Sequence, residues 1–81
     1  MKFHLSSRAF ADYQALPPQQ KKIFEKQIGF LVQDIRYPSL RAKKYEGRKD
    51  QWQARVDYEY RFYFEIVEDV YNIVAIIKHP K

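Results

Sequence analysis

Four polar side chains are expected on one face of two neighbouring strands in the C-terminal third of the chain: Gln53, Arg55, Arg61 and Tyr63. The segment from Trp52 to Val56 alternates apolar and polar residues, and the segment from Tyr60 to Val67 is rich in aromatic and β-branched residues. Both patterns predict strands whose successive side chains point to opposite faces. If the two apolar rows are buried together, the polar rows share the other face. Guanidinium, phenol and amide groups there suit an oxyanion or a phosphate, although an ordinary solvated sheet face would have the same pattern.

The connection between Pro38 and Gln51 is long for a compact domain and strongly basic. Its charged residues are Arg41, Lys43, Lys44, Glu46, Arg48, Lys49 and Asp50. We expect a short extended segment around residues 42–45 and a bend at Gly47. The basic side chains could contact a nucleic-acid backbone, or the segment could be a solvated loop without a ligand.

The first fifteen residues predict a short edge strand followed by a helix. We expect the strand over Lys2 to Leu5, with Phe3 and Leu5 facing inward. Ser6 and Ser7 are typical N-cap residues, so the helix should run from there to Ala15. Its apolar stripe is expected to consist of Phe10, Tyr13 and Leu16.

A second helix is predicted from Pro18 to about Ile35. Pro17 disfavours a helical conformation at Leu16, and Pro18 suits the first turn of a new helix, so the two helices should form a hairpin. Apolar residues recur in this helix at spacings of three and four, as one buried face requires. They are Phe24, Ile28, Leu31 and Ile35.

The two strands at 52–56 and 60–67 should be followed by a third from Val70 to Ile77, after a tight turn at Glu68 and Asp69. The third strand is apolar on both faces, which is typical of a central strand. The pattern therefore predicts an antiparallel meander and an α+β fold of order β-α-α-β-β-β. Its N-terminal helical hairpin should pack on one face of an antiparallel-dominated sheet.

The composition predicts a single domain spanning residues 1–81 and an anionic partner. The chain has 46% hydrophobic and 17% aromatic residues, a net charge of +5 and no cysteine, and its pI is near 9.5. Such a balance favours binding to nucleic acid or to an acidic protein. A thiolate metal site is excluded, two histidines are too few for a zinc site, and two glycines cannot form a Gly-rich phosphate loop. Without an apolar run of about 18 residues or a signal-peptide core, we expect a cytoplasmic protein with no membrane contact.

The order of strand, helix, proline-broken helix, basic loop and three strands resembles the RelE/ParE superfamily of small bacterial and archaeal toxins. The resemblance covers essentially the whole chain. It is carried by the segments Leu5-Ser6-Ser7-Arg8-Ala9, Leu16-Pro17, Lys43-Lys44-Tyr45-Glu46-Gly47, Trp52-Gln53-Ala54-Arg55-Val56, Tyr60-Arg61-Phe62-Tyr63-Phe64 and Ile77-Lys78-His79-Pro80-Lys81.

Membership of this superfamily would imply one of two toxic activities. RelE-like members are endoribonucleases that enter the ribosomal A site and cleave messenger RNA, using the transcript's own 2′-hydroxyl and no metal or cofactor. ParE-like members inhibit DNA gyrase. Both kinds are neutralised by a cognate antitoxin, which usually carries the DNA-binding part, so no direct DNA binding is expected of the toxin itself.

For this chain the resemblance implies three catalytic residues. Arg61, which follows an aromatic residue in the penultimate strand, would hold the scissile phosphate; the alternative is a surface arginine paired with Glu59 or Glu65. His79 would protonate the leaving 5′-oxygen, as the terminal histidine of YoeB-like and YafQ-like members implies, and Arg55 would be a second phosphate contact. The basic residues expected to bind RNA backbone are Lys43, Lys44, Arg48 and Lys81.

The chain departs from the family pattern at two points. It ends at Lys81, without the C-terminal helix and tyrosine of RelE itself, and Gln53 stands where some members have lysine. The general base is therefore open, with Glu46, Lys43 and Lys44 as candidates. A gyrase inhibitor and a catalytically degenerate RNA- or protein-binding module remain the alternatives to a nuclease.

Overall fold

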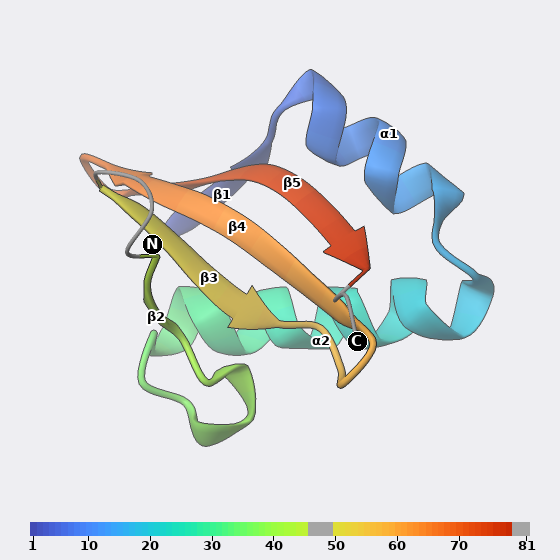
Figure 1. The fold of residues 1–81 in the computed structure, drawn as a ribbon. Helices are drawn as coiled ribbons and strands as arrows, with labels where there is room; N and C mark the ends of the chain where they lie inside the picture. The colour runs from blue at the N-terminus through green and yellow to red at the C-terminus, as the bar shows by residue number, and fades with distance from the viewer. Residues whose placement is uncertain (46–49, 79–81) are drawn as a thin grey trace.

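A computed structural model describes residues 1–45 and 50–78 (Figure 1). In chain order the elements are β1 (Lys2–Leu5), α1 (Ser7–Ala15), α2 (Pro18–Gln33), the short 3-10 helix η1 (Pro38–Leu40), β2 (Lys43–Lys44), β3 (Gln51–Arg55), β4 (Tyr60–Val67) and β5 (Val70–Lys78). The predicted α+β fold is confirmed, and the predicted strand at 60–67 has the predicted bounds.

One five-stranded sheet, in the order β1-β5-β4-β3-β2, forms the centre of the fold (Figure 1). The last three strands form the expected antiparallel meander, and β2 adds antiparallel to β3. The N-terminal strand β1 is an edge strand, as expected, and pairs parallel with β5. Strand β5 therefore has a neighbour on both sides, β1 and β4, as expected for a central strand.

The two helices begin and end near the predicted residues for identifiable local reasons. The Ser6 side chain accepts the Ala9 N–H at 3.0 Å as the N-cap of α1. Pro17 and Pro18 separate the helices, with Pro18 in the first turn of α2. That helix ends at Gln33 rather than at Ile35, because Asp34 is extended and its carboxylate accepts the Arg36 N–H at 2.9 Å.

The core lies between α2 and one face of the sheet. The predicted stripe of α2 is buried at Phe24, Ile28 and Leu31. Phe24 packs edge-to-face against Phe62 of β4, with 5.4 Å between the ring centroids. Leu40 of η1 is also fully buried in this cluster, which the basic composition of its segment did not predict.

Helix α1 lies along the edge of β5 beyond Ile73, where the pairing of β5 with β1 ends. The Ser6 hydroxyl donates to the Val74 carbonyl at 3.0 Å, and the Asp12 carboxylate accepts the Ile76 N–H at 3.0 Å. Backbone N–H and C=O groups of a strand point within the plane of the sheet, so these bonds place α1 at the sheet edge. The side that faces the core then carries Ala9, which is fully buried.

Two of the apolar residues expected to face inward are exposed. Phe10 is 49% exposed, whereas the other two residues of the predicted stripe contact the core: Leu16 is buried and Tyr13 packs against the buried cluster. Phe3, on the edge strand β1, is also 49% exposed and lies outside the buried cluster. Leu5 of the same strand does pack against that cluster, as expected.

Gln27 is the one buried polar residue among those that the structure describes, and it joins three elements. Its amide nitrogen donates to the carbonyls of Ser39 (3.0 Å) and Arg55 (2.9 Å), and its amide oxygen accepts the Ser39 hydroxyl at 3.0 Å. Helix α2 is thereby bonded to η1 and to the end of β3, where Arg55 lies.

We predict that Gln27→Leu lowers the free energy of unfolding by about 1–3 kcal/mol, because the partners of the amide lose their bonds while the volume changes little. Urea denaturation followed by circular dichroism measures the change. Gln19→Leu, at an exposed position of the same helix, is the control and should change the stability by less than about 0.5 kcal/mol. Equal stabilities for the two variants would contradict a structural role for the amide.

Candidate anion-binding site

The strand register places the four predicted polar residues together, on the face of the sheet away from the Phe62 row that α2 covers. Gln53 is opposite Tyr63, and Arg55 is directly opposite Arg61. On the other face, Ala54 is opposite Phe62 and both are buried. The predicted separation into an apolar and a polar row is therefore confirmed.

A hollow of about 430 Å³, here called the cationic hollow, lies at the Arg55 end of this face. It is lined by Arg41, Lys43, Gln53, Ala54, Arg55 and Arg61. Four of these side chains carry a positive charge, and no carboxylate is among the described residues that line it. Such a site favours an anion with several acceptor oxygens.

Two neighbouring elements supply the outer wall of the cationic hollow. Strand β2 pairs with β3 so that Lys43 is opposite Gln53. Helix η1 ends at Leu40 and is followed by Arg41, whose backbone is left-handed with φ 46° and whose N–H donates to the Pro38 carbonyl at 3.3 Å. This turn redirects the chain from α2 to β2 and positions Arg41 beside the strands.

Arg61 is held in place by the turn between β3 and β4. Its Nη1 donates to the carbonyls of Asp57 (2.7 Å) and Tyr60 (3.2 Å). The Asp57 carboxylate in turn accepts the backbone N–H groups of Glu59 and Tyr60, at 2.9 and 3.0 Å, which fixes the turn. Both bonds use Nη1, so the edge formed by Nε and Nη2 remains as a fork for two oxygens of one phosphate.

The electrostatic surroundings of Arg61 also favour an anion. Partial burial, and then the neighbouring positive charge of Arg55, lower the pKa of the Arg61 guanidinium, with Arg41 acting in the same direction and Tyr63 and Asp57 opposing it. An arginine stays protonated at neutral pH nonetheless.

The predicted alternative for Arg61, an ion pair with Glu59 or Glu65, is not found. Over residues 1–45 and 50–78 the ion pairs are Arg8–Asp12 and Arg36–Asp34. No cation of the cationic hollow therefore forms an ion pair with a carboxylate of the described chain.

The remaining predicted site residues are distributed less simply. Lys44 is on the opposite face from Lys43, with its Nζ 6.0 Å from the centroid of the Trp52 ring. Arg48, His79 and Lys81 lie outside the described residues, as does the candidate base Glu46. The last described residue, Lys78, pairs with Tyr60, the residue before Arg61.

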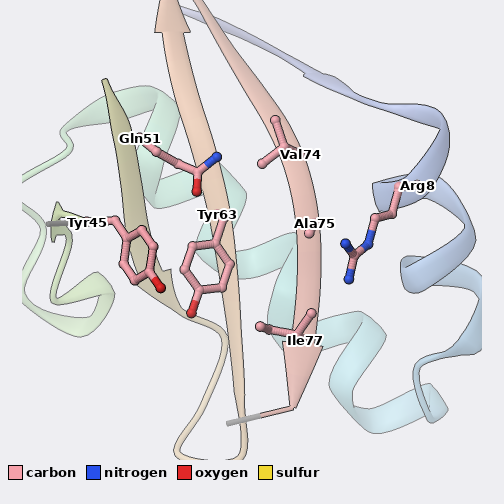
Figure 2. A pocket seen from close by; sticks show the side chains of 7 residues that line it. All are labelled: Arg8, Tyr45, Gln51, Tyr63, Val74, Ala75 and Ile77. Atoms are coloured by element: carbon pink, nitrogen blue, oxygen red, sulfur yellow. The ribbon is translucent and has the colours of Figure 1, made fainter. Parts of the chain in front are cut away.

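A second hollow, here called the tyrosine hollow, lies on the same face and was not predicted from the sequence. It has a volume of about 340 Å³ and is lined by Arg8, Tyr45, Gln51, Tyr63, Val74, Ala75 and Ile77 (Figure 2). Tyr63 was expected on this face. Arg8 was not, because it reaches the hollow only through the position of α1 at the edge of β5. Arg41 was likewise recognised only as one charge of a basic segment.

A third hollow, of about 630 Å³, extends from the cationic hollow round to helix α2 and shares Arg41 and Arg55 with it. Its walls combine apolar and aromatic side chains with a few charged groups. The lining residues are Ile23, Lys26, Gln27, Phe30, Tyr37, Pro38, Ser39, Arg41, Arg55, Val56, Asp57 and Tyr58.

Within residues 1–45 and 50–78, no cluster of three potential metal ligands occurs. In that same part of the chain, no helix has the length and apolar character needed to cross a bilayer.

No family model and no curated protein matches this sequence. Solved structures do match over nearly the whole chain. The YoeB/ParE toxin from Agrobacterium tumefaciens has a TM-score of 0.83 at 14% identity, covering 99% of this chain and 100% of that one. The YoeB dimer from Staphylococcus aureus has 0.79 at 15% identity, covering 100% and 98%. The isolated E. coli RelE toxin has 0.78 at 14% identity, covering 99% and 85%.

The chain has the fold of the RelE and YoeB toxins. At identities this low, the structural match establishes the fold but not the activity. The expected resemblance is thus confirmed as the RelE/YoeB fold, with a cationic hollow on the open face of its sheet.

We predict that Arg55→Gln raises the free energy of unfolding by about 0.2–1 kcal/mol, because like charges directly opposite in a sheet repel one another. Urea denaturation at low ionic strength measures the gain, which should shrink as salt screens the pair. A loss of stability instead would mean that the Arg55 side chain supports the fold rather than a ligand.

Proposed function

We propose that this protein is the toxin of a type II toxin–antitoxin pair and acts as an endoribonuclease on messenger RNA in the ribosomal A site. The observation that carries the proposal is the cationic hollow on a RelE/YoeB fold, with Arg55 and Arg61 opposite one another. An RNA phosphate would neutralise this charge and accept hydrogen bonds from both guanidinium groups.

The proposed reaction is a metal-free transesterification within the RNA. The 2′-oxygen attacks the adjacent phosphorus and loses its proton to a base, while the bond from phosphorus to the 5′-oxygen breaks. The products are a 2′,3′-cyclic phosphate and a 5′-hydroxyl. Arg61, through its Nε–Nη2 edge, and Arg55 would stabilise the charge that develops on the non-bridging oxygens, a contribution worth about 10²–10³ in rate for one such donor.

The remaining roles follow from the basic residues and from the terminal histidine. Lys43 and Arg41 line the same hollow and would contact the phosphate or its neighbour. Lys44, Arg48 and Lys81 are proposed to contact RNA backbone outside the hollow. His79 is proposed to protonate the leaving 5′-oxygen, and general acid catalysis of this kind contributes about 10²–10⁴ in rate.

The proposed partner is a cognate antitoxin. Proteins of the same fold from Pyrococcus horikoshii and Staphylococcus aureus were solved as RelE–RelB and YoeB–YefM complexes. The third hollow, with its aromatic walls and basic rim, suits an acidic or amphipathic segment that folds on binding. We expect the toxin to act in the cytoplasm and any DNA binding to be through the antitoxin.

We predict that induction of the wild-type chain cuts cellular messenger RNA in frame, because the ribosome presents one codon at a time. Arg61→Ala and His79→Ala should each lower the rate of cutting by about 10²-fold or more. Arg61→Lys should remain impaired, because a lysine keeps the charge but lacks the fork. Primer extension on total RNA measures the cuts.

Arg36→Ala is the matched control, since this arginine side chain is 89% exposed and pairs only with Asp34 in the described chain. Its cutting should equal that of the wild type. Growth arrest with intact messenger RNA would contradict the nuclease. If purified gyrase were then inhibited in a supercoiling assay, the activity would be that of a ParE-like toxin.

A further inference from the structure

We propose that the tyrosine hollow is a subsite for one nucleobase of the RNA, the base next to the phosphate held in the cationic hollow. This inference rests on the proposed function and adds a base-binding site to it. The position, the shape and the chemistry of the tyrosine hollow each support it.

The tyrosine hollow adjoins the cationic hollow along the same strands. Tyr63 lines the tyrosine hollow and is two residues after Arg61, which lines the cationic hollow. Residues two apart share a face of a strand and are separated by about 7 Å along it. Tyr63 is also directly opposite Gln53, another residue of the cationic hollow. A strand of RNA with one phosphate at Arg61 would therefore bring a neighbouring nucleotide over Tyr63.

The space exists because a small residue lies beside a large one. Ala75 is opposite Tyr63, and the register between β4 and β5 shifts immediately afterwards. This irregularity brings Val74 and Ala75, which are consecutive in the chain, to line the same hollow. The volume of about 340 Å³ is at the lower end of the ~300–1,000 Å³ typical of small-ligand sites, which suits one base rather than a longer segment.

The lining has the groups that bind a base. The rings of Tyr45 and Tyr63 meet edge-to-face, with 5.4 Å between their centroids and 79° between their planes. Aromatic side chains on a sheet face stack on RNA bases, and every base has a face to offer them. Gln51 adds an amide that both donates and accepts hydrogen bonds, as the edge of a base requires.

Helix α1 supplies the far wall and a cation. The two bonds that fix α1 to β5, at Val74 and Ile76, flank Ala75 in the floor of the hollow. Arg8 extends from this helix toward β5 (Figure 2). Its Nε is 3.5 Å from the Asp12 carboxylate, and its side chain is 68% exposed. Arg8 can therefore contact the phosphate on the far side of the stacked base.

The test compares two oligonucleotides that share a backbone. One is a fluorescein-labelled 2′-O-methyl hexaribonucleotide, which cannot be cut because its 2′-oxygens are blocked. The other is the same backbone with abasic sugars. Fluorescence anisotropy with the full chain should give about 5–150-fold tighter binding of the intact strand, the range expected for base stacking on an aromatic ring.

Tyr63→Ala should bring this ratio close to one while leaving the affinity for the abasic strand unchanged, and Tyr63→Phe should preserve the ratio because the ring remains. Ala75→Leu, which fills the hollow from its floor, should lower the ratio in the same way. Tyr58→Ala removes a tyrosine that is 71% exposed and lines the third hollow instead, so it should leave the ratio unchanged.

Equal binding of both strands by the wild type would overturn the subsite and leave the nuclease proposal standing. The subsite would also be overturned if Tyr63→Ala lost binding to the antitoxin while the ratio of intact-strand to abasic-strand binding stayed unchanged. That result would assign the tyrosine hollow to a peptide. No measurable binding of either strand, together with intact cellular messenger RNA, would contradict the proposed function itself.

Discussion

The fold depends on a register that places Arg55 and Arg61 directly opposite one another on the open face of the sheet. The same register buries Ala54 against Phe62 on the other face, so a shift of one residue would expose the core and bury the guanidinium groups. Burial of the apolar row is worth far more than the repulsion of two partly buried cations, which costs about 1 kcal/mol. The core therefore imposes the charge cluster, and a phosphate relieves it.

Three contacts outside the strands turn this charge cluster into a shaped site. Gln27 bonds helix α2 to the carbonyl of Arg55, so the end of β3 is fixed from the core side. Asp57 closes the turn that follows and presents a carbonyl to Arg61. Asp12 attaches α1 to the edge of β5, which adds a wall to the sheet face. Each of these polar contacts constrains a backbone segment that carries or borders a site residue, so stability and recognition share the same residues.

Side-chain alternation was sufficient to predict that Gln53, Arg55, Arg61 and Tyr63 share one face of β3 and β4, because successive residues of a strand point to opposite faces. The parallel pairing of β1 with β5 and the pairing of β2 with β3 were not predicted. The helical spacing in α1 correctly predicted the contacts of Tyr13 and Leu16 with the core but not the exposure of Phe10. A helix this short has no long stripe, and its rotation is decided by where Asp12 meets a strand distant in sequence. The burial of Gln27 and Leu40 was not predicted either. Gln27 is a polar residue and Leu40 lies in a basic segment, and both are buried by contacts with residues distant in sequence. The tyrosine hollow depends on a shift in strand register that no periodicity reveals.

The central claim is that Arg55 and Arg61 together neutralise an RNA phosphate, and the salt dependence of binding tests it most directly. The slope of log affinity against log salt for single-stranded RNA counts the phosphates neutralised, at about 0.7 for each. With an uncleavable oligoribonucleotide, the double variant Arg55→Gln/Arg61→Gln should reduce the magnitude of the slope by about 0.7, whereas Arg36→Gln should leave it unchanged. A slope equal to that of the wild type in the double variant would contradict the account.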